Sequence, residues 1–178
     1  MRYKLLSGLL IAASAAASGG PISGQFGSGY DGVRWGLPLT DLIGMMPEGD
    51  QYFSTAPGQR VYTVRNDVPL LGVPRLGTRV QYHLGKAGGV EAIAVGVPYD
   101  RYQQLLGVLI SQFGRYSQVL EVGGITYYVW DLDQQICMSV RVTKDPRYGI
   151  AEFGINHVTE SACVRKVGAP ANNRSRGP

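Results

Sequence analysis

The clearest pattern of apolar and polar positions in the chain lies within residues 96–114. Apolar side chains recur there at the three- and four-residue intervals of one helical face: Tyr102, Leu105, Leu106, Leu109, Ile110 and Phe113. Asp100 is a suitable N-cap, and Gly114 can end the helix in a left-handed conformation. The pattern predicts a helix over residues 100–113. It places Leu105, Leu106, Leu109 and Phe113 in the core, and Arg101, Gln104 and Gln112 in water.

A strand-like run at residues 30–36 leads into a shorter helical pattern at Leu39, Leu42, Ile43 and Met46. Pro38 stands near its start and Pro47 at its end. Four strand-like runs follow each helix, separated by turn signals such as Gly-Gly pairs. The first set lies near residues 51–55, 60–65, 78–84 and 90–96, and the second near 117–122, 125–131, 135–143 and 148–158.

The two helix entries resemble each other at an offset of 60 residues. Residues 36–40 (GLPLT) align with 96–100 (GVPYD), and the runs 77–84 and 89–95 align with 137–144 and 149–155. We hypothesise an internal repeat of residues 36–96 and 96–156. Hairpins without regular strand–helix alternation favour an α+β fold with an antiparallel sheet. The predicted fold is a tandem repeat of one helix plus about four antiparallel strands, with the helices packed on one face of a twisted sheet.

The first 17 residues have the composition of a secretory signal peptide. Arg2 and Lys4 precede an apolar run, and Ala15 and Ala17 form an A-x-A cleavage site. The run is too short and too rich in alanine to span a bilayer core about 30 Å thick, and no later stretch is apolar enough to do so. This predicts a periplasmic or secreted protein. Its predicted organisation is a signal peptide 1–17, a flexible lead-in 18–29, a single domain 30–167 and a disordered tail 168–178.

Charge does not indicate a nucleic-acid partner. The signal peptide holds two of the 17 basic residues and none of the 13 acidic ones, which leaves a net charge of +2 after cleavage. A nucleic-acid-binding protein would carry a clustered basic stripe, and the sequence contains none.

Two cysteines, Cys137 and Cys163, remain after signal cleavage. An even count in a secreted chain predicts a disulfide, and two buried free thiols are the alternative. The bond would close a loop of about 27 residues and contribute roughly 3–4 kcal/mol to stability.

The sequence carries no catalytic signature. His83 alternates onto the polar side of the run RVQYHL, which predicts a solvent-facing strand residue. His157 lies near Cys163, but no spacing motif supports a Cys–His nucleophile, and a disulfide would remove the thiol. Asp131 and Asp133 resemble a fragment of a calcium loop that lacks the invariant Gly and terminal Glu. We therefore predict no metal site, no cofactor and no enzymatic activity.

Aromatic residues are the more informative feature, because the chain has 11 Tyr and two Trp. Tyr128 and Trp130 share one face of a strand, and Tyr127 and Val129 share the other. One face must meet the helices. If that is the Tyr127 face, then Tyr128 and Trp130 form an exposed aromatic surface that could bind a partner protein. The alternative is that Tyr128 and Trp130 only pack across neighbouring strands.

The string GVRWGLPLTDL resembles the G-I-R-W-G entry of many small secreted bacterial proteins of unknown function. In those proteins a helix of the form Y-x-x-L-x-x-x-L-x-x-x-[FY]-G precedes a strand that bears a Trp. Here the matching residues are Tyr102, Leu105, Leu109, Phe113 and Gly114, followed by Trp130. The tandem helix-plus-four-strand plan also resembles, in architecture, that of β-lactamase inhibitory proteins and, for one unit, that of small outer-membrane assembly lipoproteins.

These observations favour a secreted or periplasmic, non-enzymatic module that binds another protein, either an envelope component or an enzyme that it inhibits. Two other hypotheses stay open. One is a small-molecule or lipid carrier, which would need an enclosed apolar pocket between helices and sheet. The other is a hydrolase, which would need a cleft where His83 or His157 meets a carboxylate.

Overall fold

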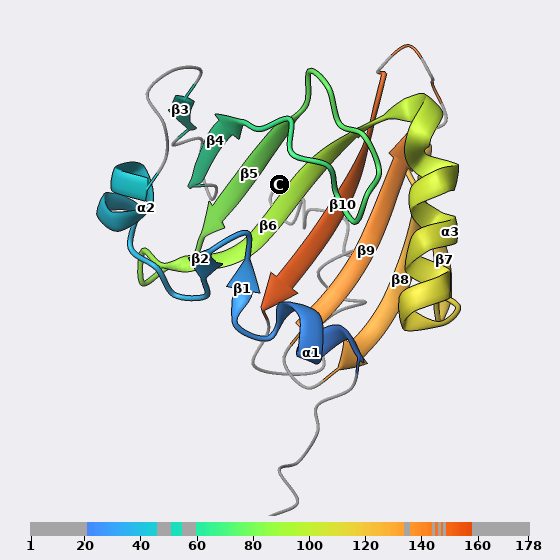
Figure 1. The fold of residues 1–178 in the computed structure, drawn as a ribbon, viewed down its shortest axis with the longest axis horizontal. Helices are drawn as coiled ribbons and strands as arrows, with labels where there is room; N and C mark the ends of the chain where they lie inside the picture. The colour runs from blue at the N-terminus through green and yellow to red at the C-terminus, as the bar shows by residue number, and fades with distance from the viewer. Residues whose placement is uncertain are drawn as a thin grey trace, which may run out of the picture.

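The computed structural model describes residues 21–45, 51–54, 60–133, 136–143, 145, 147 and 149–157. Within these ranges an eight-stranded antiparallel sheet has the strand order β3-β4-β5-β6-β10-β9-β8-β7 (Figure 1). Two four-stranded meanders make up this sheet, and they meet at their last strands, β6 and β10. The bounds are β3 Gln51–Ser54, β4 Val61–Arg65, β5 Arg79–Leu84, β6 Val90–Pro98, β7 Gln118–Val122, β8 Ile125–Asp133, β9 Ile136–Thr143 and β10 Ile150–His157.

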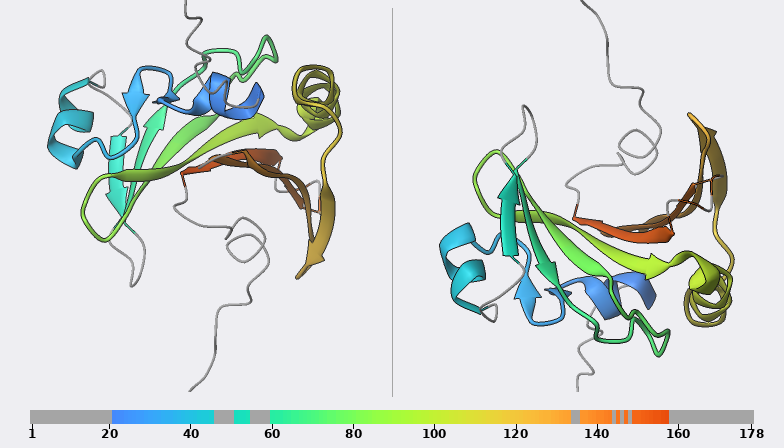
Figure 2. Two further views of the ribbon diagram at one scale, coloured as in Figure 1. Left: turned by 90° about the horizontal axis from the view of Figure 1, so that it is seen from below. Right: turned by 90° about the horizontal axis from the view of Figure 1, so that it is seen from above.

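The remaining elements are helices and one small hairpin, and they lie on one side of the large sheet (Figure 2). Buried side chains of the helices and of the sheet belong to one apolar cluster, which includes Leu42, Leu109, Val95 and Phe153. The elements are α1 Pro21–Phe26, β1 Gly29–Tyr30, β2 Val33–Arg34, α2 Leu39–Met45, the 3-10 turn η1 Tyr99–Arg101 and α3 Tyr102–Phe113. The predicted α+β class, antiparallel sheet and one-sided helices are confirmed. The tandem repeat stays a prediction.

The long helix α3 buries the face that its periodicity predicts. Leu105 and Leu109 are fully buried, and Leu106 and Phe113 are partly buried against the same core. Arg101, Gln104 and Gln112 are exposed, as expected. Ile110, which the pattern places on the apolar face, is exposed as well, so the pattern is wrong at that position. Gly114 ends the helix at φ 79°, and its N–H donates to the carbonyl of Ile110 at 3.0 Å.

The predicted N-cap of α3 is wrong. Strand β6 runs on to Pro98, and the chain enters the helix through the 3-10 turn η1, so Asp100 lies inside that turn. Its carboxylate instead lies 3.6 Å from the guanidinium of Arg101. The helix begins at Tyr102 without a side-chain cap.

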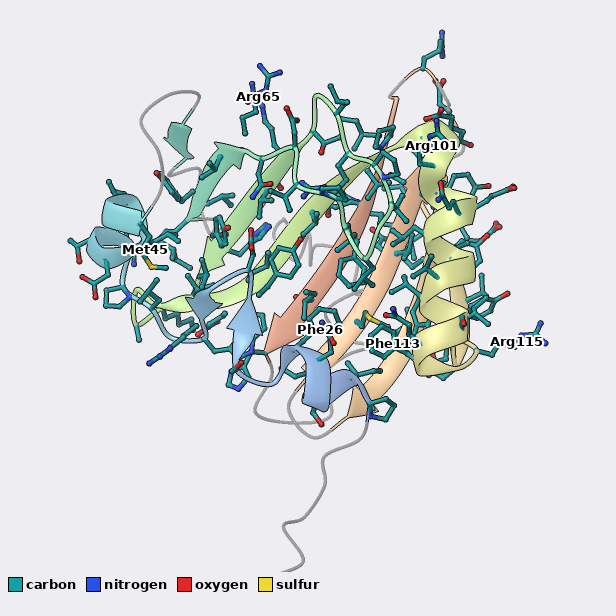
Figure 3. The ribbon with its side chains drawn as sticks, viewed as in Figure 1. Phe26, Met45, Arg65, Arg101, Phe113 and Arg115 are labelled. Carbon is teal, nitrogen blue, oxygen red and sulfur yellow. The ribbon has the colours of Figure 1, made fainter. Side chains whose placement is uncertain are left out.

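The prediction of a flexible lead-in is wrong for residues 21–29. Helix α1 occupies Pro21–Phe26 and buries Ile22 and Phe26. The Phe26 ring lies 5.8 Å from that of Phe113 (both are labelled in Figure 3). It also lies 5.9 Å from that of Phe153. Two apolar residues four positions apart are enough to fix this turn of helix on the core, although the flanking residues are Gly and Ser.

The predicted strand at 30–36 is a two-strand hairpin. Strands β1 and β2 pair through Gly29 with Arg34 and Tyr30 with Val33. A Cβ atom at Gly29 would lie only 1.9 Å from the carbonyl oxygen of Val33, so only glycine fits there. Beyond the hairpin, the indole N–H of Trp35 donates to the carbonyl of Phe26 at 2.8 Å and ties the two segments together.

Several predictions concern residues outside the described ranges. They are the signal peptide 1–17, the first residues of the lead-in, Met46, Cys163 and the tail 168–178. Within the described part of the chain, no helix has the length and apolar character needed to cross a bilayer.

Candidate functional site

The exposed surface predicted for Tyr128 and Trp130 does not exist, because both side chains face the helices. Trp130 is only 2% exposed, and its indole N–H donates to the carbonyl of Gly114 at 2.8 Å. Tyr128 is partly buried, and its ring lies 5.1 Å from that of Tyr116. Both side chains therefore pack against the core and the segment that follows α3, which is more than the packing across neighbouring strands that the alternative named. Tyr127 takes the opposite face of β8.

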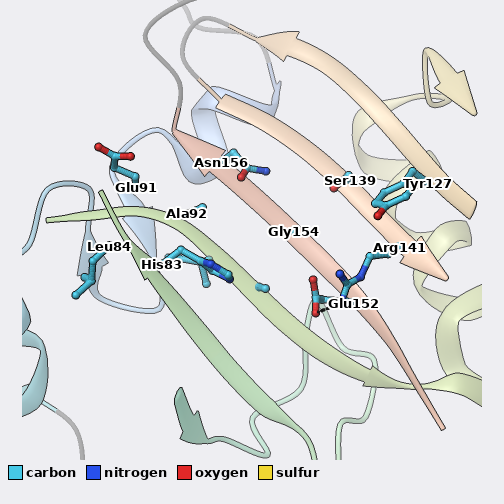
Figure 4. A pocket seen from close by; sticks show the side chains of 12 residues that line it. His83, Leu84, Glu91, Ala92, Tyr127, Ser139, Arg141, Glu152, Gly154 and Asn156 are labelled. Carbon is cyan, nitrogen blue, oxygen red and sulfur yellow. Dashed lines mark hydrogen bonds and ion pairs between the residues drawn. The ribbon is translucent and has the colours of Figure 1, made fainter. Parts of the chain in front are cut away.

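Within the described residues, no helix covers that opposite face of the sheet, which we call the helix-free face. The sheet curves toward this side between β10 and β7, as Figure 2 shows. A hollow of about 340 Å³ lies in the curve (Figure 4). We call it the trough. A second hollow, of about 410 Å³, adjoins it and shares the side chains of Arg141 and Glu152.

The trough follows from the size of the side chains on neighbouring strands. Its floor consists of the small residues Ala92, Ala94, Ser139 and Gly154, which lie on β6, β9 and β10. Strand pairing places Ser139 beside Gly154 and Gly154 beside Ala94, so these small residues form a continuous row. Larger residues stand at the sides, with His83 on β5 and Tyr127 on β8.

One end of the trough carries an ion pair. Arg141 and Glu152 are direct partners on β9 and β10, and their side chains meet at 2.8 Å. Burial raises the pKa of Glu152, and the neighbouring Arg141 guanidinium lowers it. Burial, and after it the charge of Arg141, lowers the pKa of His83. The imidazole of His83 therefore tends to be neutral at pH 7. A neutral imidazole has one nitrogen that donates a hydrogen bond and one that accepts.

The trough is lined by His83 together with the carboxylates of Glu91 and Glu152, which is the combination that the hydrolase hypothesis asks for. Among the described residues of the trough, however, the one hydroxyl of a serine is far from this histidine. His83 lies on β5 and Ser139 on β9, with two strands between them, a separation of about 14 Å along the sheet. Among the described residues, no three His, Cys, Asp or Glu side chains gather closely enough to bind a metal ion. The other histidine, His157, lies outside the trough, and its ring stacks on Trp35 at 5.6 Å. The described side chains that line the trough are mostly polar.

Cys137 also belongs to the helix-free face. It is buried beside Val129, with Leu120 and Tyr127 packed against the pair. Its predicted partner, Cys163, lies outside the described residues, so the disulfide stays a prediction.

Sequence reasoning missed Tyr127, Arg141 and Glu152. Alternation along β8 correctly separates Tyr127 from Tyr128, but both faces of this strand are aromatic and apolar, so alternation alone does not tell which one faces the helices. Arg141 and Glu152 are each the polar member of an alternating strand. Only the register of β9 with β10 shows that they are partners.

Replacement of Arg141 by Ala should make stability more dependent on pH. Without the guanidinium, the pKa of Glu152 rises further above its ordinary 4.5. A carboxyl group with a raised folded-state pKa stabilises the fold at low pH, and this contribution disappears as the pH rises through that pKa. In urea unfolding, the free energy of unfolding of the variant should therefore fall further below that of the wild type as the pH rises from 4.5 to about 7.

The charge of Arg141 also lowers the pKa of His83, so without it the protonation of His83 costs the folded state less at acid pH. This effect likewise makes the variant lose stability relative to the wild type as the pH rises. Arg101→Ala is the matched control, because Arg101 is an exposed arginine beside a carboxylate on the other side of the sheet. A stability difference between Arg141→Ala and the wild type that is constant with pH would show that the ion pair does not set the pKa of Glu152.

Comparison with known proteins adds one distant likeness. No protein-family model matches the sequence, and no curated protein matches it. Among solved structures, the chain is similar to the crystal structure of a DUF4309 family protein (YjgB) from Bacillus subtilis, at 20% sequence identity and a TM-score of 0.39. The match covers 67% of this chain and 78% of the other. A likeness this distant says nothing about the chemistry of the trough.

Proposed function

We propose that the protein is a secreted or periplasmic, non-enzymatic module that binds an extended segment of another protein in the trough. The observation that carries this proposal is the row of small residues on a concave sheet face, flanked by polar side chains. Because the side chains of the floor are small, a bound polypeptide can lie close to the backbone of the sheet. From His83 on β5 to Tyr127 on β8, four strand spacings give a span of about 19 Å, wider than one extended chain with its side chains.

The polar groups of the trough fit the backbone and side chains of a protein segment. Arg141 offers a cation, Glu152 a carboxylate, and Tyr127 and Asn156 add a phenol and an amide. The second hollow extends this surface to Ile150, an exposed apolar side chain that a partner can cover. Charged and apolar groups in one open groove suit a protein segment better than a lipid, which needs an enclosed apolar pocket.

We also propose that the two meanders derive from one duplicated unit. At the offset of 60 residues, Ala94 corresponds to Gly154, and these two residues pair in the β6–β10 ladder. Ile93 pairs with Ile155 and Val95 with Phe153, so the ladder is symmetric about that centre. In the strands before β6 and β10, which are β5 and β9, the offset between the two meanders changes by two. There Val95 pairs with Val80, whereas Ile155, the counterpart of Val95, pairs with Met138.

A photo-crosslinking experiment in the native host tests the binding function. A photoreactive benzoylphenylalanine at Ile150 should give, on irradiation of intact cells, a covalent adduct with one partner protein, because this exposed position borders the trough. The same amino acid at Gln104, exposed on α3, is the matched control and should give no such adduct. Equal adducts from both positions, or none from Ile150, would contradict the proposal.

A second variant ties that adduct to the ion pair. With the crosslinker at Ile150, an added Arg141→Ala change should lower the adduct yield about tenfold, the usual cost of one lost hydrogen bond to a charged group. Thermal melts at the same pH check that the variant is folded. An unchanged yield would place the partner elsewhere on the surface.

A further inference from the structure

We infer that the outer edge of β7 is an interface that pairs with the same edge of a second copy of this chain. The two strands run antiparallel about a twofold axis at Leu120, so that two eight-stranded sheets become one. Three observations carry this inference: the direction of the backbone groups of β7, the exposure of its side chains, and the position of its one charged residue. The dimer does not depend on the function proposed for the trough.

Strand β7 is the last strand of the large sheet, and among the described strands it pairs only with β8. Figure 1 shows it at the margin of the sheet, behind α3. Proteins commonly block such an edge with lysine, with proline or with a covering element. Residues 118–122 read QVLEV and contain neither lysine nor proline. The outer side of β7 can therefore add another strand.

The turn that follows β7 determines which of its backbone groups point outward. Gly123 and Gly124 both have positive φ, 56° and 79°, as the type I′ turn of a two-residue hairpin requires. In such a hairpin the residues that flank the turn exchange both backbone hydrogen bonds, and here they are Val122 and Ile125. This pair fixes the phase of the whole β7–β8 ladder.

The outward groups of β7 match those of a second β7. Hydrogen-bonded pairs alternate along an antiparallel ladder, so Leu120 bonds to β8 as Val122 does. The N–H and C=O groups of Val119 and Glu121 then point away from β8. In a twofold arrangement about Leu120, Val119 of each copy lies opposite Glu121 of the other, and each such pair can exchange two backbone hydrogen bonds. Both outward residues of the strand are thereby satisfied.

The side chains of this edge are accessible to a second copy. Val119 is 48% exposed and Val122 is 37% exposed, and Glu121 between them is exposed as well. Val119 lies opposite Tyr128 and so on the helix side of the sheet, yet α3 leaves about half of it uncovered. Pairing of two β7 edges would cover apolar side chains that are exposed in one copy alone.

The position of Glu121 selects the register. It is the one charged residue in the sequence of β7. A twofold axis at Leu120 places Glu121 opposite the uncharged Val119. An axis at Glu121 itself would place the two carboxylates directly opposite each other, which destabilises a strand pair. The register that pairs both outward residues is thus also a register without charge repulsion across the axis.

This arrangement also determines how the two sheets face. Residues directly opposite each other on antiparallel strands have their side chains on the same face. Leu120 lies opposite Tyr127 on the helix-free side, and Leu120 of the second copy takes the same side in the dimer. The two helix-free faces therefore form one continuous surface, and both troughs open on the same side of the joined sheet.

Sedimentation equilibrium of the purified secreted protein, over about a hundredfold range of concentration, tests the dimer. The wild type should change from monomer to dimer within this range. Val119→Pro removes one outward N–H and leaves the hydrogen bonds to β8 in place, because an edge strand tolerates proline where the N–H faces away from the sheet. This variant should dimerise about tenfold more weakly or less. A wild type that stays monomeric throughout, or a Val119→Pro variant that dimerises as tightly as the wild type, would overturn the inference.

A pair of charge variants tests the register. Val119→Lys places an ammonium group opposite Glu121 of the other copy at two symmetric positions, so the dimer should become about tenfold tighter. Val119→Glu places a second carboxylate there and should weaken the dimer about tenfold. Thermal melts check that both variants are folded.

The matched controls are Ile43→Lys and Ile43→Glu. Ile43 is 46% exposed on α2, which lies at the opposite end of the molecule from β7 (Figure 1). Neither control should change the dissociation constant by more than about twofold. Lysine and glutamate at position 119 that change it in the same direction, or an effect of equal size at Ile43, would overturn the pairing about Leu120.

Discussion

Leu109→Ala should lower the free energy of unfolding by roughly 2–5 kcal/mol, the usual range for opening a cavity in a packed core. Leu109 is fully buried on the inner face of α3, in the same cluster as Phe153 and Trp130. The surrounding side chains come from a rigid sheet, so they can collapse only partly into the space. A domain of this size has about 5–15 kcal/mol of stability in total, so the loss is a large fraction. Urea unfolding followed by circular dichroism measures it.

Gln104→Ala is the matched control on the same helix. Gln104 is exposed and faces away from the sheet, so its replacement should change stability by no more than about 0.5 kcal/mol. Equal unfolding midpoints for the two variants would mean that α3 presents a different face to the core than the structure shows.

Arg75→Met should cost a similar amount, roughly 2–6 kcal/mol, for a different reason. Arg75 is only 1% exposed, yet its guanidinium donates to the carbonyls of Gly96 and Val68, each at 2.9 Å. These bonds hold the segment between β4 and β5 against the sheet. Methionine keeps most of the side-chain volume but donates no hydrogen bond, so two carbonyls lose their partner at about 1–3 kcal/mol each.

Arg75→Lys distinguishes hydrogen-bond geometry from charge. Lysine keeps the positive charge, but its single ammonium group cannot span two carbonyls that a planar guanidinium reaches from separate nitrogens. We expect the lysine variant to recover only a minor part of the stability in thermal and urea unfolding. Full recovery would show that the charge of Arg75, and not its fork of donors, holds the segment.

The sequence predicts local elements well because period and turn chemistry are local properties. The eight expected strands agree with the observed ones to within about three residues, and the inner face of α3 is correct at Leu105 and Leu109. The cross-strand neighbours of these elements are a property of the whole fold. The sequence alignment sets Val80 against Val140, whereas the strand pairing makes Val80 correspond to Met138, two residues earlier.

The candidate site depends almost entirely on such non-local information. The trough exists because Ala94 and Gly154, far apart in the sequence, become neighbours across β6 and β10. Its charged end exists because the register of the consecutive strands β9 and β10 pairs Arg141 with Glu152. The hydrophobic pattern of β8 also has apolar residues on both faces, so it cannot say that Trp130 turns inward. Helix α1 was missed for the opposite reason, because Ile22 and Phe26 give too short a pattern to outweigh the Gly and Ser around them.

The meeting of β6 and β10 determines how the molecule holds together as a unit. Seven residue pairs join the two meanders along this ladder, and the apolar cluster beneath it takes side chains from both, such as Tyr82 from one and Met138 from the other. Either meander alone would leave its final strand as an unpaired edge. The backbone hydrogen bonds of β6 are thus completed by β10, and those of β10 by β6. Each meander depends on the other, so we expect the two to unfold as one cooperative unit.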